Sequence, residues 1–375
     1  MAGIYIHIPF CKQACHYCDF HFSTSLKNKE SFISALKKEI KLQKDYLKNE
    51  KISTIYFGGG TPSLLYKNEI LEILEELNTY HQIDSEAEIT LEANPDDLTM
   101  QKIKELKKTP VNRLSIGIQS FFDDDLKFMN RAHNSNEALS SVKTLQDVGF
   151  DNITIDLIYG IPNLSDEKWK KNLKTTFDLN IQHVSSYCLT VEPRTALASF
   201  IKKGQVKKLD DEQGAKQFQI LMEETKNNGF IQYEISNFSK EGFLSKHNSN
   251  YWLKEKYLGL GPSAHSYNGN SRQWNVANNF LYIQSLEKSQ LKYEKEILSE
   301  INQYNEYIMT SLRTIWGIDL IYIQKNFGKK IHDSIIEESR HYINSEHLIN
   351  SNHKIILSDK GKLIADKIAS DLFTV

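Results

Sequence analysis

Residues 4 to 22 read IYIHIPFCKQACHYCDFHF, which joins a strand-like segment to a cysteine-rich loop. The segment Ile4 to Ile8 alternates apolar and polar side chains, which predicts a β-strand. Pro9 ends this strand because proline cannot donate to a strand ladder. Three cysteines follow with the spacing C-x3-C-x2-C, namely Cys11, Cys15 and Cys18. Since the chain of 375 residues contains only 4 cysteines, three in one loop indicate a shared role.

The cysteine spacing leaves three interpretations open. Disulfides are the weakest, because an odd number of neighbouring cysteines cannot all pair locally. A zinc site with His7, His16 or His21 as fourth ligand is a second interpretation, although structural zinc usually uses two separated ligand pairs. An iron–sulfur cluster held by the thiolates is the interpretation that the spacing favours. Three thiolates on four irons would leave one iron open for a further ligand.

The composition is that of an ordinary soluble globular protein, with 40% hydrophobic and 25% charged residues. The formal net charge of -2 provides no global field that would attract nucleic acid or an anionic membrane. No apolar run approaches the roughly 20 residues that a membrane-spanning helix needs. Cysteine is sparse, no cationic and apolar leader precedes the first strand, and an open thiolate cluster needs reducing conditions. We therefore expect a cytoplasmic protein.

Strands and helices alternate through the first half of the chain. The sequence predicts strands at 4–8, 52–57, 88–92, 112–119, 152–158 and 182–189. Helices are expected at 28–49, 67–78, 98–108, 123–129, 135–148 and 166–179. This alternation predicts a parallel sheet in an α/β fold. Six units are fewer than the eight of a closed barrel, so we expect a partial, open (β/α)6 barrel, with a doubly wound sheet as the alternative.

Polar residues and glycines collect where the predicted strands end. They are Cys11 to Cys18, Gly58 to Pro62, Glu92 to Pro95, Gln119, Asp156 and Thr190. Parallel α/β folds place their sites at this edge of the sheet, so the pattern predicts a binding site there. The glycine stretch Gly58 to Gly60 allows the backbone to come close to a ligand. It is not a P-loop, because no Gly-Lys-Ser/Thr follows.

The second half of the chain has a different character. Lys246 to Trp252 and Gly259 to Ser266 are rich in Gly, Ser and His, and we expect them to be loops that line a site. Helices at 299–312, 319–327 and 331–343, a hairpin at 348–357 and a last helix at 359–372 predict a winged-helix-like domain. This region has 9 Lys and Arg against 11 Asp and Glu from residue 296 to 375, so we expect no nucleic-acid binding. We divide the chain into a barrel (1–235), a connecting segment (236–295) and a C-terminal domain (296–375) that docks or covers.

Two motifs together resemble the radical S-adenosylmethionine superfamily: the C-x3-C-x2-C loop, with Tyr17 before its third cysteine, and the glycine-rich loop after the second strand. The motif series is similar to that of the oxygen-independent coproporphyrinogen oxidase group. The matching stretches are Tyr5 to Cys11, Gly58 to Pro62, Glu92 to Pro95, Ser115 to Gln119, Asn130-Arg131 and Asp156 to Pro162. The resemblance covers nearly the whole chain.

The resemblance implies roles for these residues. Cys11, Cys15 and Cys18 would ligate a 4Fe-4S cluster, and S-adenosylmethionine would chelate the fourth iron. Gly59, Gly60 and Thr61 would hold its methionine moiety. The remaining positions matched to cofactor ligands, together with the candidate at the sixth strand end, are Tyr5, Tyr17, Glu92, Gln119, Arg131, Asp156 and Thr190. In active members of the superfamily, one electron from the cluster cleaves the sulfonium to a 5′-deoxyadenosyl radical.

Two features separate the subgroups of this family. The oxidases proper have another cysteine two positions after the third, and Phe20 stands there in this chain. In addition, His247-Asn248-x-x-Tyr251-Trp252 matches the H-N-x-x-Y-W motif of the HemW group of heme chaperones. A histidine beside an aromatic pair suits axial ligation and ring stacking on a porphyrin. The resemblance therefore implies that His247 binds heme, with His265 as a second candidate.

The resemblance implies a heme chaperone whose main activity is binding rather than turnover. Its partners would be heme and heme-acceptor proteins such as respiratory hemoproteins, with peripheral contact to acceptors that are membrane-bound. The alternative is an oxygen-independent coproporphyrinogen III oxidase, an enzyme that converts coproporphyrinogen III to protoporphyrinogen IX by oxidative decarboxylation. A radical enzyme with an unrelated substrate is a third interpretation.

Overall fold

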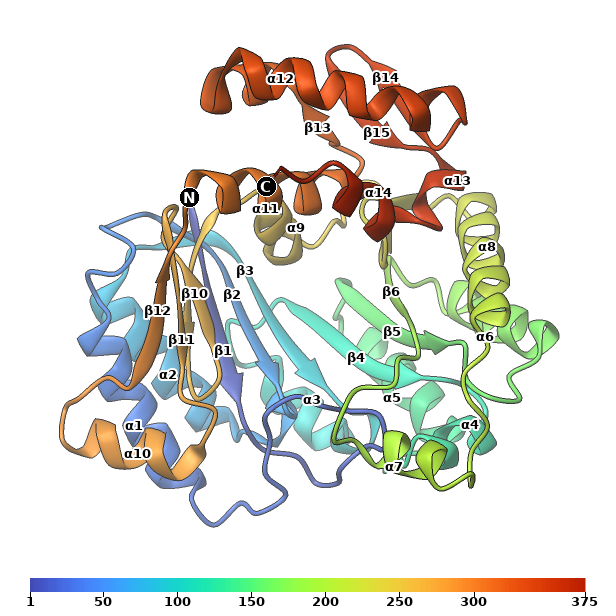
Figure 1. The fold of residues 1–375 in the computed structure, drawn as a ribbon. Coiled ribbons are helices and arrows are strands. Elements are labelled where there is room, and N and C mark those ends of the chain that lie inside the picture. Colours follow the sequence, from blue (N-terminus) through green and yellow to red (C-terminus); the bar gives the residue numbers. More distant parts are fainter. Residues whose placement is uncertain (375) are drawn as a thin grey trace.

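Six parallel strands form the centre of one large sheet in the computed structural model, which describes residues 1–374 (Figure 1). They are β1 (Ala2–Ile8), β2 (Ile52–Gly59), β3 (Ile83–Ala93), β4 (Arg113–Gln119), β5 (Ile153–Tyr159) and β6 (His183–Cys188). Each strand pairs in parallel with the next one along the chain. The intervening helices are α1 (Lys29–Leu42), α2 (Lys67–Tyr80), α3 (Met100–Leu106), α4 (Asp123–Phe128), α5 (Ser135–Asp147) and α6 (Asp166–Asp178). The predicted α/β fold is confirmed.

The sheet curves but does not close. Its order is β12-β11-β10-β9-β1-β2-β3-β4-β5-β6-β8-β7, and the two outermost strands do not pair with each other. β9 (Lys256–Leu260) continues the parallel part beside β1. The remaining strands are antiparallel to their neighbours: β10 (His265–Tyr267), β11 (Ser271–Asn275) and β12 (Tyr293–Ile297) at one side, and β7 (Ile231–Gln232) and β8 (Asn237–Ser239) at the other. The predicted partial, open barrel is therefore confirmed.

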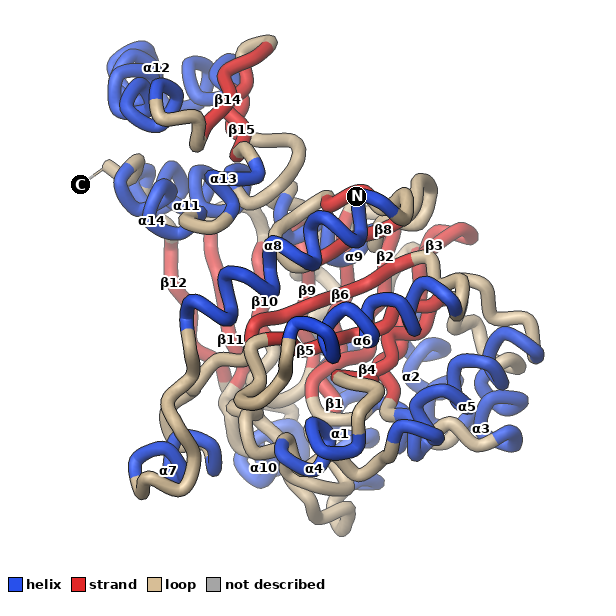
Figure 2. The backbone as a smooth tube through the Cα atoms, turned by 90° about the vertical axis from the view of Figure 1, so that its right-hand side faces the viewer, coloured by secondary structure: helices blue, strands red, loops and turns tan. Residues whose placement is uncertain are grey.

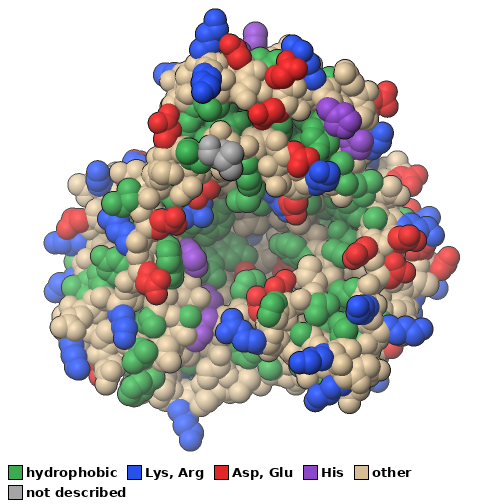
Figure 3. Space-filling view, in the orientation of Figure 1, with side chains coloured by type: hydrophobic (Ala, Val, Ile, Leu, Met, Phe, Trp, Pro, Cys, Tyr) green, Lys and Arg blue, Asp and Glu red, His purple; other side chains and the backbone are tan. Residues whose placement is uncertain are grey.

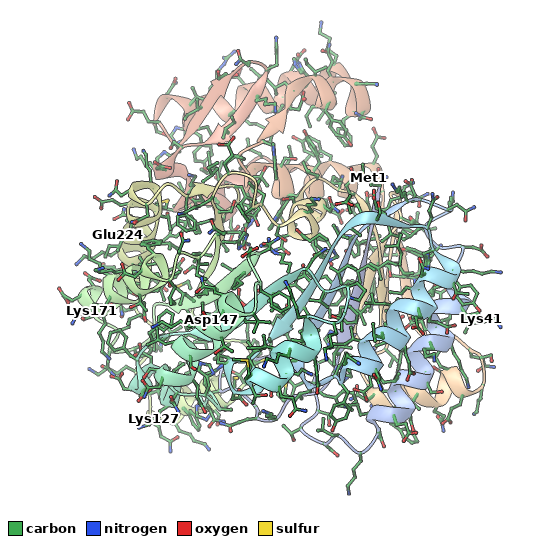
Figure 4. All side chains as sticks on the ribbon, turned by 180° about the vertical axis from the view of Figure 1, so that it is seen from behind. Met1, Lys41, Lys127, Asp147, Lys171 and Glu224 are labelled. Carbon is green, nitrogen blue, oxygen red and sulfur yellow. The ribbon has the colours of Figure 1, made fainter. Side chains whose placement is uncertain are left out.

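The two faces of the sheet differ in polarity because strand side chains alternate between them. Ile4, Ile6 and Ile8 of β1 are fully buried and belong to the main hydrophobic core with the helices. Tyr5 and His7 lie on the opposite, concave face. Helices α5, α6 and α8 (Asp211–Asn227) cover the outer face in Figure 2. Their charged side chains, such as Lys171, project outward in Figure 4, as does Lys41 of α1 at the opposite side of the molecule.

Several predicted elements differ in the structure. The helix expected at 28–49 ends at Leu42, and turns follow it. The loop expected at 246–252 is wrong, and of the loop expected at 259–266 only residues 261–264 lie outside a strand. Residues 246–252 form the helix α9 (Lys246–Trp252), which begins where the Ser245 hydroxyl accepts a hydrogen bond from the Asn248 amide at 3.3 Å. Residues 256–267 supply β9 and β10. β9 pairs with the distant strand β1, and β10 pairs with β9 and β11.

The C-terminal residues surround a second hydrophobic core, formed by buried side chains between residues 304 and 372. Its elements are α11 (Glu300–Leu312), β13 (Ile318–Asp319), α12 (Leu320–Asn344), β14 (Leu348–Ser351), β15 (Lys354–Leu357), α13 (Asp359–Lys362) and α14 (Ala365–Asp371). The predicted hairpin is confirmed by the antiparallel pairing of β14 with β15. The two helices expected at 319–327 and 331–343 lie within α12, which is two helical segments joined at a kink, where Gly328 is non-helical (φ 86°, ψ 171°).

The C-terminal elements and the ends of the parallel strands lie on opposite sides of the molecule. In Figure 1 the strand arrows point away from α11, α12 and α14, toward the loop that follows β1. Two short helices complete the chain, α7 (Ala196–Lys202) after β6 and α10 (Asn279–Glu287) before β12. Across the described residues 1–374, no helix combines the length and the apolar character that crossing a membrane requires.

Candidate functional site

The cysteine loop, residues 10–22, is tied down over the carboxyl ends of the strands. The Cys11 amide donates to the Ser23 carbonyl at 3.0 Å, and the His16 amide donates to the Met129 carbonyl at 3.1 Å. The Asn130 side chain donates to the Ala14 carbonyl at 2.7 Å. The loop is therefore held by a backbone bond between its two ends and by the segment that joins α4 to α5. Its side chains are thus positioned before any ligand binds.

The three thiols of this loop are unpaired and half-buried. Burial raises the pKa of Cys11, and burial together with the two neighbouring thiols raises the pKa of Cys18 to about 11. The Cys15 sulfur accepts a hydrogen bond from Arg131 Nη1 at 3.3 Å. Three thiols that affect one another electrostatically, beside a buried guanidinium, fit an iron–sulfur cluster, because its cationic irons favour the thiolate form.

The zinc interpretation is not supported by the arrangement of donors. Within residues 1–374, no three His, Cys, Asp or Glu side chains are grouped around one metal position, the three cysteines included, so a zinc site would need a histidine that is free to join the thiols. His7 Nε2 is bonded to the His21 carbonyl at 2.8 Å, and His16 Nδ1 to the Phe128 carbonyl at 2.8 Å. The histidines of this region are thus used in holding the loop.

The glycine stretch forms a cradle directly against the cysteine loop. The Gly60 amide donates to the Ile8 carbonyl at 2.9 Å, and a Cβ on Gly60 would lie 2.6 Å from the Phe10 carbonyl oxygen. Gly59 has φ 106°, which favours glycine, and a Cβ there would lie 2.6 Å from the His7 ring. Thr61 is buried and its side chain is hydrogen-bonded to Cys11. This cradle fits the amino-acid part of S-adenosylmethionine next to an open iron.

Glu92 and Arg131 flank the cradle, with a carboxyl group on one side and a guanidinium on the other. Glu92 Oε2 accepts from the Gly59 amide at 3.2 Å, and Oε1 accepts from the Tyr56 hydroxyl at 2.8 Å. Burial, with a smaller contribution from the Asp156 carboxylate, raises the pKa of Glu92 to about 8. Arg131 Nη2 donates to Asn94 Oδ1 at 2.7 Å and to the Gly117 carbonyl at 2.8 Å. Among the described residues its buried Nε has no partner, so one donor is left for a ligand.

The other candidates lie on the strands or directly after them, or in the cysteine loop. Tyr5 and Asp156 are the only half-buried residues of β1 and β5, whose other residues are buried. Asp156 accepts from the Ser115 hydroxyl at 3.1 Å, and burial raises its pKa to about 7. Arg131 and the thiols Cys15 and Cys18 surround Tyr17, and burial raises the pKa of this tyrosine. Gln119 ends β4 with φ 64°, and Thr190 is exposed after β6. Figure 3 shows a hollow in this face of the molecule.

The structure places His247 at the opposite end of the barrel interior. Glu88 accepts hydrogen bonds from the amides of Lys246 and His247, at 3.0 and 2.9 Å, which fixes the start of α9 under the sheet. The His247 ring is 2% exposed, with Nδ1 bonded to Thr54 Oγ1 at 2.8 Å and Nε2 to the Tyr251 hydroxyl at 3.0 Å. Burial lowers its pKa to about 3. Both nitrogens are occupied in this conformation, and the ring is not brought to the cysteine loop.

His265, the second heme candidate, is exposed and stacks on Trp274 with ring centroids 5.9 Å apart. Three residues that contact the candidate site or α9 were missed by the sequence analysis: Thr54, Tyr56 and Glu88. Their signal is the strand alternation, which places Thr54 and Tyr56 on the same face as Gly58.

Known proteins resemble this chain along its whole length. Residues 5–175 match the model of the radical SAM superfamily. The chain is 34% identical to the heme chaperone HemW of Bacillus subtilis (strain 168), over 98% of each protein. It is 33% identical to the heme chaperone HemW of Lactococcus lactis subsp. lactis (strain IL1403), over 95% of this chain and 93% of that one.

A solved structure supports the same grouping at the level of the fold. The radical SAM enzyme HemN, the coproporphyrinogen III oxidase of Escherichia coli, superposes with a TM-score of 0.86 at 21% identity. The superposition covers 100% of this chain and 90% of HemN, which shows a common fold. With the cysteine loop, the glycine cradle and the full-length relatives, the chain belongs to the HemW family within the radical SAM superfamily.

Proposed function

We propose that this protein is a heme chaperone, which binds heme and transfers it to acceptor proteins. The observation that carries the proposal is the identity of 34% with a HemW heme chaperone over 98% of both chains. The H-N-x-x-Y-W motif at residues 247–252 and the phenylalanine at position 20 agree with it. Both had pointed away from the oxidase subgroup on sequence alone.

The site would hold two further cofactors. Cys11, Cys15 and Cys18 would ligate a 4Fe-4S cluster, which supplies one-electron chemistry when bound. Gly59, Gly60 and Thr61 would hold the methionine part of S-adenosylmethionine, and the acidic group of Glu92 would accept hydrogen bonds from its ammonium. The unpartnered Nε of Arg131 offers a donor for a carboxylate. Tyr5, Tyr17, Gln119, Asp156 and Thr190 would line the remaining cofactor surface.

We propose His247 as the heme ligand, and this role requires α9 to move. Both ring nitrogens are engaged, so ligation of heme iron needs the bond to Thr54 or to Tyr251 to break. The aromatic neighbours Tyr251 and Trp252 would then be available for stacking on the porphyrin. A buried neutral imidazole is already in the protonation state that binds a metal.

The proposed partners are heme-acceptor proteins such as respiratory hemoproteins, including membrane-bound ones that the chain would contact peripherally. We propose the division into a barrel (1–235), a connecting segment (236–295) and a C-terminal domain (296–375), in which the last unit docks or covers. The two hydrophobic cores support only the separation of the C-terminal domain, because residues of the connecting segment such as Leu258 and Leu286 belong to the same core as the barrel. The mixed charge of the last unit favours a protein contact over nucleic acid. We propose the cytoplasm as its compartment, since free thiols persist under reducing conditions.

Anaerobic heme transfer tests the function. The reconstituted chain is titrated with heme, separated from unbound heme and mixed with an apo-hemoprotein, and the absorbance of both proteins is followed. We expect stoichiometric binding and then appearance of the holo-acceptor. Formation of protoporphyrinogen IX from coproporphyrinogen III, with S-adenosylmethionine and a reductant, would instead identify the oxidase and overturn the chaperone proposal.

A further inference from the structure

One tyrosine touches both ends of the barrel interior. The rings of Tyr56 and His247 stack with centroids 4.9 Å apart and an interplanar angle of 24°. The Tyr56 hydroxyl donates to Glu92 Oε1 at 2.8 Å. A single side chain in β2 therefore connects the candidate heme ligand on α9 with the acidic group at the glycine cradle.

The Tyr56 ring is closely packed, so a movement of the ring would displace its neighbours. Its ring also stacks on Tyr5, with centroids 6.1 Å apart. A Cβ added at Gly58 would lie 2.9 Å from both tyrosine rings and 3.1 Å from Glu92 Oε1, so these groups are packed closely around one glycine. A shift of the Glu92 carboxylate thus bears directly on the position of the Tyr56 ring.

α9 is held in place by a small set of side-chain contacts. The helix has seven residues and is held by the Glu88 cap, by Thr54 and by the stack on Tyr56. From the C-terminal side, Lys254 donates to the Gln303 carbonyl at 3.0 Å, and the Arg313 guanidinium lies 5.8 Å from the Trp252 ring. So short a helix has little stability of its own, and its hold depends on these side-chain contacts.

We propose that Tyr56 is a positioning residue that couples binding of an ammonium group at Glu92 to the release of α9. An ammonium drawn to Glu92 competes with the Tyr56 hydroxyl for Oε1. When that hydrogen bond is lost, the Tyr56 ring is no longer fixed, and the stack that holds His247 weakens. S-adenosylmethionine, which carries such an ammonium, would thereby make His247 accessible. The inference rests on the proposed function and deepens it by linking its two ligands.

Linkage makes the coupling reciprocal: heme ligation by His247 must strengthen S-adenosylmethionine binding by the factor by which the cofactor strengthens heme binding. Coupling between sites is typically about 5-fold or more. The competition at Glu92 fixes the sign of the coupling between S-adenosylmethionine and heme. Both ligands favour the conformation in which α9 is loosened.

Hydrogen exchange of peptides that span residues 246–253 tests the proposal. In the reconstituted wild type, S-adenosylmethionine should raise the exchange rate of α9 by about 5-fold. Tyr56→Phe keeps the ring and removes the hydroxyl. It should therefore raise α9 exchange without any ligand, to the level that the cofactor produces in the wild type, and the cofactor should then add nothing.

Tyr159→Phe is the matched control, because this tyrosine lies in β5 on the outer face, against Trp169 and Phe218. It should leave α9 exchange and its response to the cofactor unchanged. Equal α9 exchange in Tyr56→Phe and wild type, in the cofactor-free chain, would overturn the coupling whatever heme does. If α9 responds as expected and heme does not bind, the chaperone function fails and the coupling stands.

Discussion

The guanidinium of Arg131 lies 3.3 Å from the sulfur of Cys15, although 116 residues separate them in the chain. This contact joins the two segments that build the cofactor edge, the cysteine loop and the connection between α4 and α5. Arg131 Nη1 donates to this sulfur and so helps to hold the Cys15 side chain in place. The cysteine loop is thereby prepared for its proposed cluster by a residue that sequence spacing alone does not associate with it.

Cys15→Ala should abolish cluster assembly, because an iron of the cluster loses its thiolate. Anaerobic reconstitution of the wild type should give a broad absorbance near about 400 nm from iron–sulfur charge transfer, and the variant should lack it. Cys188→Ala is the control, since this fourth cysteine lies outside the loop and is exposed. Retention of the full absorbance in Cys15→Ala would refute the three-thiolate assignment.

His247→Ala should weaken heme binding strongly, because it removes the proposed axial ligand. His332→Ala, in α12 and outside both heme candidates, should bind heme like the wild type. Heme titrations followed by absorbance compare the three proteins. Equal heme affinity in the wild type and His247→Ala would show that the motif does not ligate heme.

Gly59→Ala should lower the free energy of unfolding by about 2 kcal/mol or more, since backbone strain and a steric clash add together. Gly204→Ala shares the positive φ (70°) but meets nothing within 4 Å, so it should cost only about 1 kcal/mol. Urea unfolding of the cofactor-free chains under reducing conditions measures both. Calorimetry of the reconstituted chains should show weaker S-adenosylmethionine binding for Gly59→Ala alone. Equal costs for the two variants would contradict the close approach to His7.

Glu39 should make the protein less stable as the pH rises. Its fully buried carboxyl accepts from the Gly261 amide, the Asn275 side chain and the Tyr282 hydroxyl, and burial raises its pKa from 4.5 to about 7. The folded state therefore binds more protons than the unfolded state between these values. The stabilisation is complete below about pH 4.5 and is lost through about pH 7, amounting to roughly 3 kcal/mol.

Glu39→Gln, which cannot titrate, should remove this part of the pH dependence. Urea unfolding of both proteins at several values between about pH 5 and pH 8 gives the two slopes. We expect the wild type to lose stability relative to the variant over this range. Parallel curves would show that Glu39 titrates with an ordinary pKa.

The sequence predicts the parallel core of the fold well, because strand alternation and amphipathic helices are local patterns. It also predicts that Gly59 and Glu92 lie at one edge, since the ends of parallel strands meet there. Asp156, which was placed at a strand end, is instead the fourth of the seven residues of β5. The region after residue 236 was less predictable. β9 is defined by its pairing with β1, and α9 by a cap from Glu88, which lies 159 residues from His247. Such partners are set by tertiary contacts that no local pattern encodes.

The position of His247 illustrates the same limit within the site. The motif marks the residue, but only the fold shows that its ring is occupied by Thr54 and Tyr251. Tyr56 likewise carries no motif, and its importance follows from where β2 places it between two other side chains. Motifs thus mark candidate residues one by one, whereas the contacts among them appear only in the folded chain.

The open sheet has a consequence for how the protein behaves at high concentration. A barrel that does not close leaves the backbone groups of β12 unpaired along one side, and such an edge invites another chain to add a strand. β12 is exposed along its whole length and carries Glu294, Lys295 and Glu296 in succession. A second molecule docking edge to edge would bring these charges together and strip them of water. These three charges therefore oppose strand addition at the centre of β12, whereas Tyr293 and Ile297 leave apolar side chains exposed at its two ends.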